Sequence, residues 1–449
     1  MANDNGVQHP AADYEIKKAR LSAQMKAGSS VRLSKETSNL FRSRVNGGEK
    51  ILSARDFNRV LRVNKDEGWA EVEGMTTYED FVNQTLKFGL MPAVVPQLKT
   101  ITIGGAATGV GIESTSFRYG LVHETLIEME ILLSSGDTVV CNKYEHADLF
   151  YGFPNSYGTF GYALKLKVKL IPVKLYVKIE HARYDNSETY FQALGTACRS
   201  NFDFVDGVMF GPGEMYVTTG KFVDQSPFVS DYTYLDIYYK SIRVKKEDYL
   251  SVHNYLWRWD TDWFWCSNVF KAQKPVIRRL LGKKRLNSAF YGKIMKWDKK
   301  YRFSERFFPL FGIHEEWVIQ DVDIPLDNAP KFVEFFFREI GIKPVWVCPI
   351  GSFDKSVRFP LYPLSPDKLY VNFGFWGPVR TDKEKGFYNK LVESKVSEFV
   401  GRKGLYSDSF YTEEDFWKIY NKPAYDLLKQ KYDPQGKLKN LYDKCVRKL

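Results

Sequence analysis

Several features that would settle a protein's class at once are missing from this chain of 449 residues. No uninterrupted apolar run is long enough to span a bilayer, and the first residues lack the basic-then-apolar pattern of a signal peptide. There is no HExxH motif and no CxxC pair, and the cysteines are scattered at Cys141, Cys198, Cys266, Cys348 and Cys445. We therefore expect a reducing, cytoplasmic environment, no disulfide framework and no metal site.

The common phosphate-binding motifs are missing as well. The chain has no GxxxxGK[ST] sequence, which excludes a P-loop. It has no GxGxxG between a strand and a helix with an acid about twenty residues later, which argues against a Rossmann dinucleotide site.

Glycine is instead concentrated in one stretch, ITIGGAATGVGIESTSFRYG, at residues 101–120. Glycine loses more conformational freedom on folding than any other residue, so a cluster of five needs a reason. Backbone N–H groups on a tight turn, supplemented by Ser and Thr hydroxyls, form a nest that suits a pyrophosphate. The alternative is a turn that packs tightly and binds nothing.

The rest of the pattern predicts an α+β protein. Helical periodicity with capping signals covers residues 13–28, 76–90 and 329–341. Alternating apolar residues around short polar turns predict β-hairpins at 58–74 and 126–141.

Two segments resemble the FAD contacts of the vanillyl-alcohol oxidase (PCMH-type) flavoproteins: VVPQLKTITIGGAATGVGIESTSFRYG and the later NSYGTFGYALKLKVKLIPV. The likeness is greatest to the branch of sterol side-chain reductases, which saturate the C24 double bond of desmosterol. It extends through ADLFYGFPNSYGTFG, WVIQDVDIP, WVCPI and EEDFW, which occur in the same order. Several matches in one order are far more specific than any single motif.

This resemblance implies a two-lobed FAD-binding domain at residues 1–175 and a substrate domain with a large antiparallel sheet at 176–405. A C-terminal helical segment, 406–449, is expected to return to the FAD-binding domain. The implied activity is FAD-dependent reduction of a carbon–carbon double bond in a lipid-like substrate such as a sterol or isoprenoid side chain. NADPH is a possible electron donor, although no dedicated nicotinamide motif is present.

Two other functions remain open at this point. One is an FAD-dependent oxidase or dehydrogenase of an alcohol or sugar, including a lipid-linked sugar. The other is a non-enzymatic protein that binds a membrane surface. The glycine-rich loop contains no His or Cys, and the nearest histidine, His123, has the ordinary interpretation of a structural residue, so we expect FAD to be bound without a covalent link.

The resemblance also assigns the cofactor contacts. The family's first contact loop corresponds to SKETSN, which lacks glycine and would have to use side chains instead. The expected contacts are Ser34, Lys35, Thr37, Ser38, Asn39, Gln97, Thr100, Thr102, Gly104, Gly105, Thr108, Gly109, Gly111, Ile112, Glu113, Ser114, Gly158, Thr159, Gly161 and Lys431.

Three of the candidate residues are expected to act in catalysis. LKQKYDP resembles a segment that brings a lysine to the flavin, which points to Lys431 as a charge-stabilising group. In VIQDVDIP, alternation puts Asp321 and Asp323 on one face of a strand, and the resemblance favours Asp321 as the proton donor. Glu113 is a second candidate acid. The expected substrate contacts are Gln320, Asp321, Trp346 and Cys348.

Positive charge is concentrated in one region. Residues 271–303 hold twelve Lys or Arg and one acid, which accounts for the whole formal net charge of +11. Four tryptophans precede them at Trp257, Trp259, Trp263 and Trp265. A solvated basic face is the simplest interpretation. Because tryptophan and lysine favour membrane interfaces, we instead expect residues 255–303 to bind anionic membranes peripherally. No nucleic-acid-binding motif accompanies the charge, and the sequence does not indicate an oligomeric state.

Overall fold

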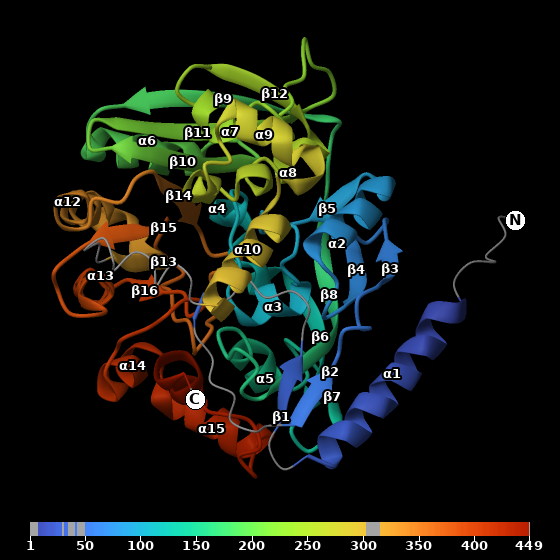
Figure 1. Ribbon diagram of the computed structural model, residues 1–449. Coiled ribbons are helices and arrows are strands. Elements are labelled where there is room, and N and C mark those ends of the chain that lie inside the picture. Colours follow the sequence, from blue (N-terminus) through green and yellow to red (C-terminus); the bar gives the residue numbers. More distant parts are fainter. Residues whose placement is uncertain (1–7, 29–30, 35–40, 43–49, 302–314, 449) are drawn as a thin grey trace, which may run out of the picture.

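The computed structural model describes residues 8–28, 31–34, 41–42, 50–301 and 315–448. Two sheets divide the molecule into an N-terminal lobe, whose last strand ends at Pro172, and a second lobe, whose first strand begins at Tyr176. Figure 1 shows the N-terminal lobe in blue and cyan beside the second lobe in green and orange. The α+β class expected from the sequence is confirmed.

The N-terminal lobe contains a mixed arrangement of strands and short helices. Its six-stranded sheet has the order β3-β4-β8-β6-β7, with β5 pairing to β8, while β1 and β2 form a separate parallel pair. The elements are α1 (Gln8–Lys26), β1 (Val31–Ser34), β2 (Lys50–Ser53), β3 (Val60–Asn64), β4 (Trp69–Glu73), α2 (Tyr78–Thr85), β5 (Leu90–Pro92), α3 (Ile103–Thr108), α4 (Ser116–Tyr119), β6 (Leu126–Leu133), β7 (Thr138–Asn142), α5 (Ala147–Gly152) and β8 (Gly161–Pro172).

Local sequence explains these elements. The central strand β8 alternates buried leucines and valines with partly exposed lysines, which is the pattern of a strand with one face on the core. Thr77 caps the N-terminus of helix α2, and its hydroxyl accepts a hydrogen bond from the backbone N–H of Asp80 at 3.1 Å. Such a cap satisfies a backbone donor that the first helical turn leaves without a partner.

The second lobe is an eight-stranded antiparallel sheet with the order β12-β9-β11-β10-β14-β15-β13-β16. Helices α6, α12 and α13 pack their apolar faces against one side of it. The elements are β9 (Tyr176–Tyr184), α6 (Ser187–Arg199), β10 (Phe204–Gly211), β11 (Glu214–Val223), α7 (Tyr238–Ser241), β12 (Glu247–Ser251), β13 (Glu315–Pro325), α12 (Ala329–Glu339), β14 (Val345–Ile350), β15 (Tyr370–Arg380), α13 (Phe387–Glu398) and β16 (Arg402–Lys403).

A run of short helices, which we call the cap segment (residues 252–301), links β12 to the region before β13. It comprises α8 (Val252–Leu256), α9 (Pro275–Leu281) and α10 (Ser288–Tyr301), with 3₁₀ turns between them. Two buried acids hold it: Asp262 pairs with Arg278, and Asp260 accepts the backbone N–H of Lys99 at 3.1 Å. In Figure 1, α10 of the cap segment and α3 of the N-terminal lobe are both seen near the middle of the molecule.

The C-terminal segment returns to the N-terminal lobe. Helices α14 (Glu413–Ile419) and α15 (Lys422–Tyr432) are followed by a π-helical turn, Asp443–Arg447. Leu428 of α15 packs directly against Gly152 of α5. In the part of the chain that the structure describes, no helix is both long and apolar enough to cross a membrane.

Candidate active site

A cavity of about 360 Å³ lies where the two lobes, the cap segment and the C-terminal segment meet. The N-terminal lobe contributes the glycine-rich loop and the start of β8. The second lobe contributes β13, β14 and β15, and the cap segment contributes a row of apolar side chains. The glycine-rich loop and the strand that carries Asp321 and Asp323 therefore face one common cavity.

Most of the expected cofactor contacts line this cavity. They are Gln97, Thr100, Thr102, Gly104, Gly105, Thr108, Gly109, Gly111, Ile112, Glu113, Gly158 and Gly161. Ser34, Ser114 and Thr159 do not line it: Ser114 is fully buried and its hydroxyl donates to Glu113 Oε1 at 2.6 Å. Lys35, Thr37, Ser38 and Asn39 lie outside the described residues.

The glycines of the loop serve packing as well as access. The N–H of Gly104 donates to the Gly74 carbonyl at 2.9 Å, and a Cβ at Gly104 would lie 2.7 Å from the same oxygen. The N–H of Gly105 donates to Thr102 Oγ1 at 3.3 Å. These two donors are already used within the protein, which corrects the expectation that they form a free anion nest. Bare backbone is nevertheless required here, because helix α3 approaches a neighbouring main chain so closely.

Several buried polar groups in the cavity have no partner in the protein. Both the amide nitrogen and the amide oxygen of Gln97 lack a hydrogen bond although the residue is only 4% exposed, and the Tyr157 hydroxyl lacks one too. A buried polar group without a partner is destabilising by roughly 1–3 kcal/mol. A bound ligand with polar groups at these positions would remove that cost.

A buried cation also faces the cavity. Arg42 is 3% exposed, its guanidinium stacks 4.6 Å from the Tyr157 ring centroid, and one amino group donates to the Leu405 carbonyl and to Cys445 Sγ. Its Nε has no partner. Lys444 lines the same space and donates to the Tyr157 carbonyl at 2.7 Å. Sequence reasoning missed both residues because neither lies in a recognisable motif.

Lys431 does not reach the cavity, which corrects its assignment as a cofactor contact and charge-stabilising group. It lies on the outer face of α15, with its side chain 55% exposed, and its ammonium pairs with Asp148 at 2.7 Å. The resemblance of LKQKYDP located the right part of the chain, but the helical phase turns Lys431 toward solvent.

Asp321 and Asp323 lie on the cavity side of β13, as alternation predicted, but their surroundings differ. Asp323 accepts from the Tyr362 hydroxyl and from Asn372 Nδ2, both at 2.7 Å. Asp321 keeps one carboxylate oxygen, Oδ1, without a partner. The pKa of Asp321 is raised to about 7, chiefly by burial and additionally by the negative charge of Asp323, while a hydrogen bond from Tyr406 opposes the shift.

The sheet leaves room for the Asp321 carboxyl. Its partner across the ladder is Gly374, where a Cβ would lie 2.7 Å from Asp321 Oδ1 and 2.6 Å from the Trp376 ring. The Trp376 indole N–H donates to the Tyr406 hydroxyl at 2.9 Å, which fixes both rings beside the acid. A carboxyl near neutral pKa in an aromatic cavity is a typical proton donor.

Two of the four expected substrate contacts do not line the cavity. Gln320 lies on the opposite face of β13, where its amide donates to Asn389 Oδ1 of α13 at 2.8 Å. Cys348 is fully buried in the core and does not line the cavity. These positions correct the prediction. Side chains alternate between the two faces of a strand, so Gln320, next to Asp321, points away from the cavity. Trp346 and Asp321 do line the cavity.

Glu113 belongs to a buried charge cluster that the sequence did not reveal. Arg258, from the tryptophan-rich part of the cap segment, donates to Asp206 at 2.7 Å and lies 3.5 Å from Glu113 Oε1. Burial raises the pKa of Glu113 to about 7, against the opposing charge of Arg258. The sequence contained one signal for this cluster, an arginine between two tryptophans. Such an arginine is expected to be buried, and a buried guanidinium requires an acidic partner.

The four tryptophans of the cap segment are buried, with Trp257, Trp259, Trp263 and Trp265 between 1% and 9% exposed. They therefore cannot contact a membrane, which corrects their expected role. Trp263 lines the cavity and stacks on Phe41 at a centroid distance of 5.7 Å.

His123 lies away from the cavity, against the Phe359 ring. Burial lowers its pKa to about 3, so the imidazole is neutral. Among the described residues that line the cavity there is no histidine, and burial raises the pKa of the one lining cysteine, Cys266, to about 12, which keeps its thiol protonated.

Comparison with known proteins agrees with this geometry. Residues 13–142 match the family model of the FAD binding domain. The chain is 25% identical to the Delta(24)-sterol reductase of Homo sapiens over 414 residues, which cover 86% of this chain and 76% of that protein. The Delta(24)-sterol reductase of Pisum sativum is 25% identical over 447 residues, covering 87% and 75%.

A further relative matches a shorter part of the chain. Cytokinin dehydrogenase 7 of Oryza sativa subsp. japonica is 27% identical over 154 residues, which cover 32% of this chain and 29% of that protein. The matches to the sterol reductases cover 86% and 87% of this chain and therefore include parts of both lobes. The expected family resemblance and the FAD cofactor are thus confirmed.

Proposed function

We propose that this chain, an FAD-dependent oxidoreductase homologous to the Delta(24)-sterol reductases, reduces a carbon–carbon double bond in a lipid-like substrate. The observation that supports it most is the Asp321 carboxyl, which combines a pKa of about 7 with a partnerless oxygen on the cavity wall. A sterol or isoprenoid side chain is the substrate class that the apolar, ring-lined wall suits.

The N-terminal lobe and the C-terminal segment would hold the cofactor. Gln97 and Thr102 offer polar side chains, the glycines of the loop allow close approach, and Arg42 offers a buried positive charge. When bound, the flavin supplies the hydride chemistry of the reaction. A fixed cation near it favours the reduced, more negative form of the ring, and Arg42 takes the part that the sequence assigned to Lys431.

Asp321 would deliver the proton. Saturation of a double bond adds one hydride and one proton, and the two electrons of the hydride come ultimately from a nicotinamide donor such as NADPH. At neutral pH a carboxyl with a pKa of about 7 is protonated in a large fraction of molecules, so it donates without prior proton uptake. Asp323, bound on both oxygens, holds its place in the sheet and remains outside proton transfer.

The aromatic wall would orient the substrate and exclude water. Phe264, Trp346 and Trp376 lie close together, with ring centroids of Phe264 at 5.4 Å from Trp346 and 4.7 Å from Trp376. Such a surface binds an apolar side chain through burial.

An anionic membrane surface is proposed as the partner of residues 255–303, in agreement with the sequence expectation. The support is the exposed positive charge of this region and a lipid-like substrate that is stored in membranes. The burial of the tryptophans leaves other side chains of the segment to make the contact.

The test is an absorbance spectrum of the purified protein under anaerobic conditions. NADPH should bleach the flavin bands, and a sterol with a C24 double bond should restore them in the absence of oxygen. Bleaching by an alcohol or sugar, with recovery only in air, would identify an oxidase instead. Acid precipitation should release the yellow colour into the supernatant, since the flavin is proposed to be non-covalent.

A further inference from the structure

The cavity reaches solvent at two exposed apolar residues. Val269 and Trp317 both line the cavity, yet they are 54% and 41% exposed, so they mark its mouth. Val269 belongs to the cap segment and Trp317 to β13. Exposed apolar surface at a binding groove marks an interaction site, and these two residues stand at the opening of a largely apolar cavity.

A second pair of exposed apolar residues lies a few residues further along the cap segment. Val276 and Leu280 are 66% and 77% exposed and are four residues apart on α9, so they share one outward face of the helix. The helix cannot rotate them inward, because the buried Arg278 on its other side pairs with Asp262 and donates to the Tyr234 carbonyl.

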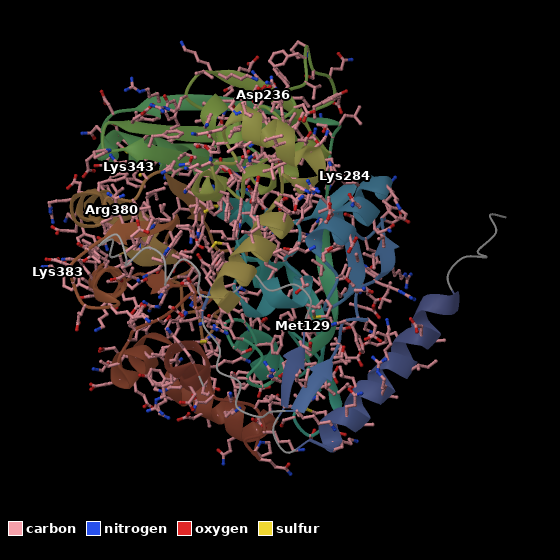
Figure 2. The ribbon with its side chains drawn as sticks, viewed as in Figure 1. Met129, Asp236, Lys284, Lys343, Arg380 and Lys383 are labelled. Atoms are coloured by element: carbon pink, nitrogen blue, oxygen red, sulfur yellow. The ribbon has the colours of Figure 1, made fainter. Side chains whose placement is uncertain are left out.

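The surface around α9 carries charge of one sign. Residues 263–295 contain eight Lys or Arg and no Asp or Glu. Seven of the eight are exposed: Lys271, Lys274, Arg279, Lys283, Lys284, Arg285 and Lys293. Lys283 has Asp231 at 4.0 Å, a long and exposed contact. Figure 2 labels Lys284 at the edge of the molecule. We call α9, its exposed basic neighbours and Val269 the docking face.

We propose that the docking face binds an anionic lipid bilayer, with Val276 and Leu280 inserted among the acyl chains and the basic side chains at the headgroups. Val269 links the two features, because it lies at the mouth of the cavity and seven residues before Val276 in the cap segment. Docking through α9 would then let the substrate pass from the membrane to the cavity without crossing water. This inference rests on the proposed function only for the identity of the substrate that enters the cavity. Binding itself depends on apolar insertion together with attraction to negative lipids.

The experiment is co-sedimentation of the full chain, with its flavin, with vesicles of phosphatidylcholine alone or with phosphatidylserine added. Wild type should pellet with the anionic vesicles at low salt and be released at high salt, since a Debye length of roughly 3 Å at 1 M salt screens surface charge. The double variant V276D/L280D should bind at least about tenfold more weakly. L427D is the matched control, because Leu427 is a 69% exposed leucine on another basic helix, α15.

Turnover separates this proposal from the proposed function. V276D/L280D should lose activity on substrate embedded in anionic vesicles and keep wild-type activity on substrate dispersed in detergent. Equal pelleting with neutral and anionic vesicles overturns the docking face, and so does wild-type binding by V276D/L280D. If the vesicles bind as expected but no alkene reoxidises the flavin, the docking face stands and the reductase assignment fails.

Discussion

The two walls of the cavity differ in the types of residue that line them. The wall of the N-terminal lobe includes bare main chain at Gly104 and Gly161, together with polar side chains such as Gln97. The wall of the second lobe is rings and carboxyls, set by Asp321, Trp346 and Trp376. The first wall fits a large polar cofactor, and the second supplies a proton and an apolar surface. The difference indicates that cofactor binding and substrate chemistry can be perturbed separately.

The largest effect is expected from Asp321→Asn. Loss of a positioned proton donor lowers a rate by roughly 10²–10⁴-fold, and only the half-reaction with the alkene uses this proton. Stopped-flow absorbance should show normal reduction of the flavin by NADPH and a strongly slowed reoxidation by the substrate. Asp323→Asn is the matched control on the same strand. It should lower the melting temperature while leaving reoxidation much closer to wild type, because both oxygens of Asp323 serve Tyr362 and Asn372.

Equal slowing of both half-reactions in Asp321→Asn would place this carboxyl in cofactor binding. The two walls could then not be perturbed separately. Normal rates in both would leave it a structural acid.

The next effect is the pH dependence of reoxidation. Since Asp321 must be protonated to donate and its pKa is raised to about 7, the rate should be constant at low pH and fall about tenfold per pH unit above about 7. Reduction by NADPH should not follow this profile. The variant Asp321→Asn should lose the break near pH 7. A break that persists in it would have to be assigned to another buried carboxyl, Glu113 or Asp323, whose pKa values are raised to about 7 and about 6.

The same shift has a consequence for stability. Folded Asp321 binds its proton up to about pH 7, whereas the unfolded chain releases it near pH 4. Between these values the native state holds more protons than the unfolded state, so rising pH lowers the free energy of unfolding. Asp321→Asn removes this penalty, and its melting temperature should exceed that of wild type at pH 8 by more than at pH 4. Equal differences at both pH values would contradict the raised pKa.

A smaller effect, confined to the other wall, is expected from Gly104→Ala. The added Cβ would lie 2.7 Å from the Gly74 carbonyl oxygen, so helix α3 must shift, at about 1–3 kcal/mol. Flavin content after purification should fall together with the melting temperature. Gly292→Ala is the control, because nothing lies within 4 Å of a Cβ at that helical position and alanine is the better helix former, by up to about 1 kcal/mol. Retention of full flavin content by Gly104→Ala would show that the loop adapts.

The two walls also differ in how well sequence describes them. The glycine-rich loop is one contiguous stretch, so a local pattern placed most of its residues at the cavity. The pattern predicted a turn there and did not reveal that Ile103–Thr108 form helix α3. The second wall is assembled from three strands and the cap segment. Strand alternation predicted that Asp321 and Asp323 share a face, and the same period shows why Gln320 points away.

What sequence could not supply is the outcome of tertiary packing. Whether four tryptophans lie in a core or at a surface depends on what covers them, and composition alone favoured the surface. Arg42 and Arg258 reach their partners across 363 and 52 positions of the chain, in contacts to Leu405 and Asp206. Val276 and Leu280 are ordinary helix residues in the sequence. Their exposure follows from the burial of Arg278 on the other side of α9, which only the structure shows.

The smallest effect is expected from Lys431→Ala, which tests whether the cationic contribution to the cavity comes from α15 or from Arg42. The Lys431 side chain is 55% exposed and its partner Asp148 is 43% exposed, so their ion pair contributes only about 0–1 kcal/mol. The ammonium does not line the cavity, and its charge is screened by solvent before it reaches the cofactor region. Flavin content, the rate of reduction by NADPH and the rate of reoxidation should all stay within about twofold of wild type. A loss of flavin reduction of two orders of magnitude, the size expected of a charge that stabilises the reduced ring, would show that α15 turns Lys431 inward when the cofactor binds.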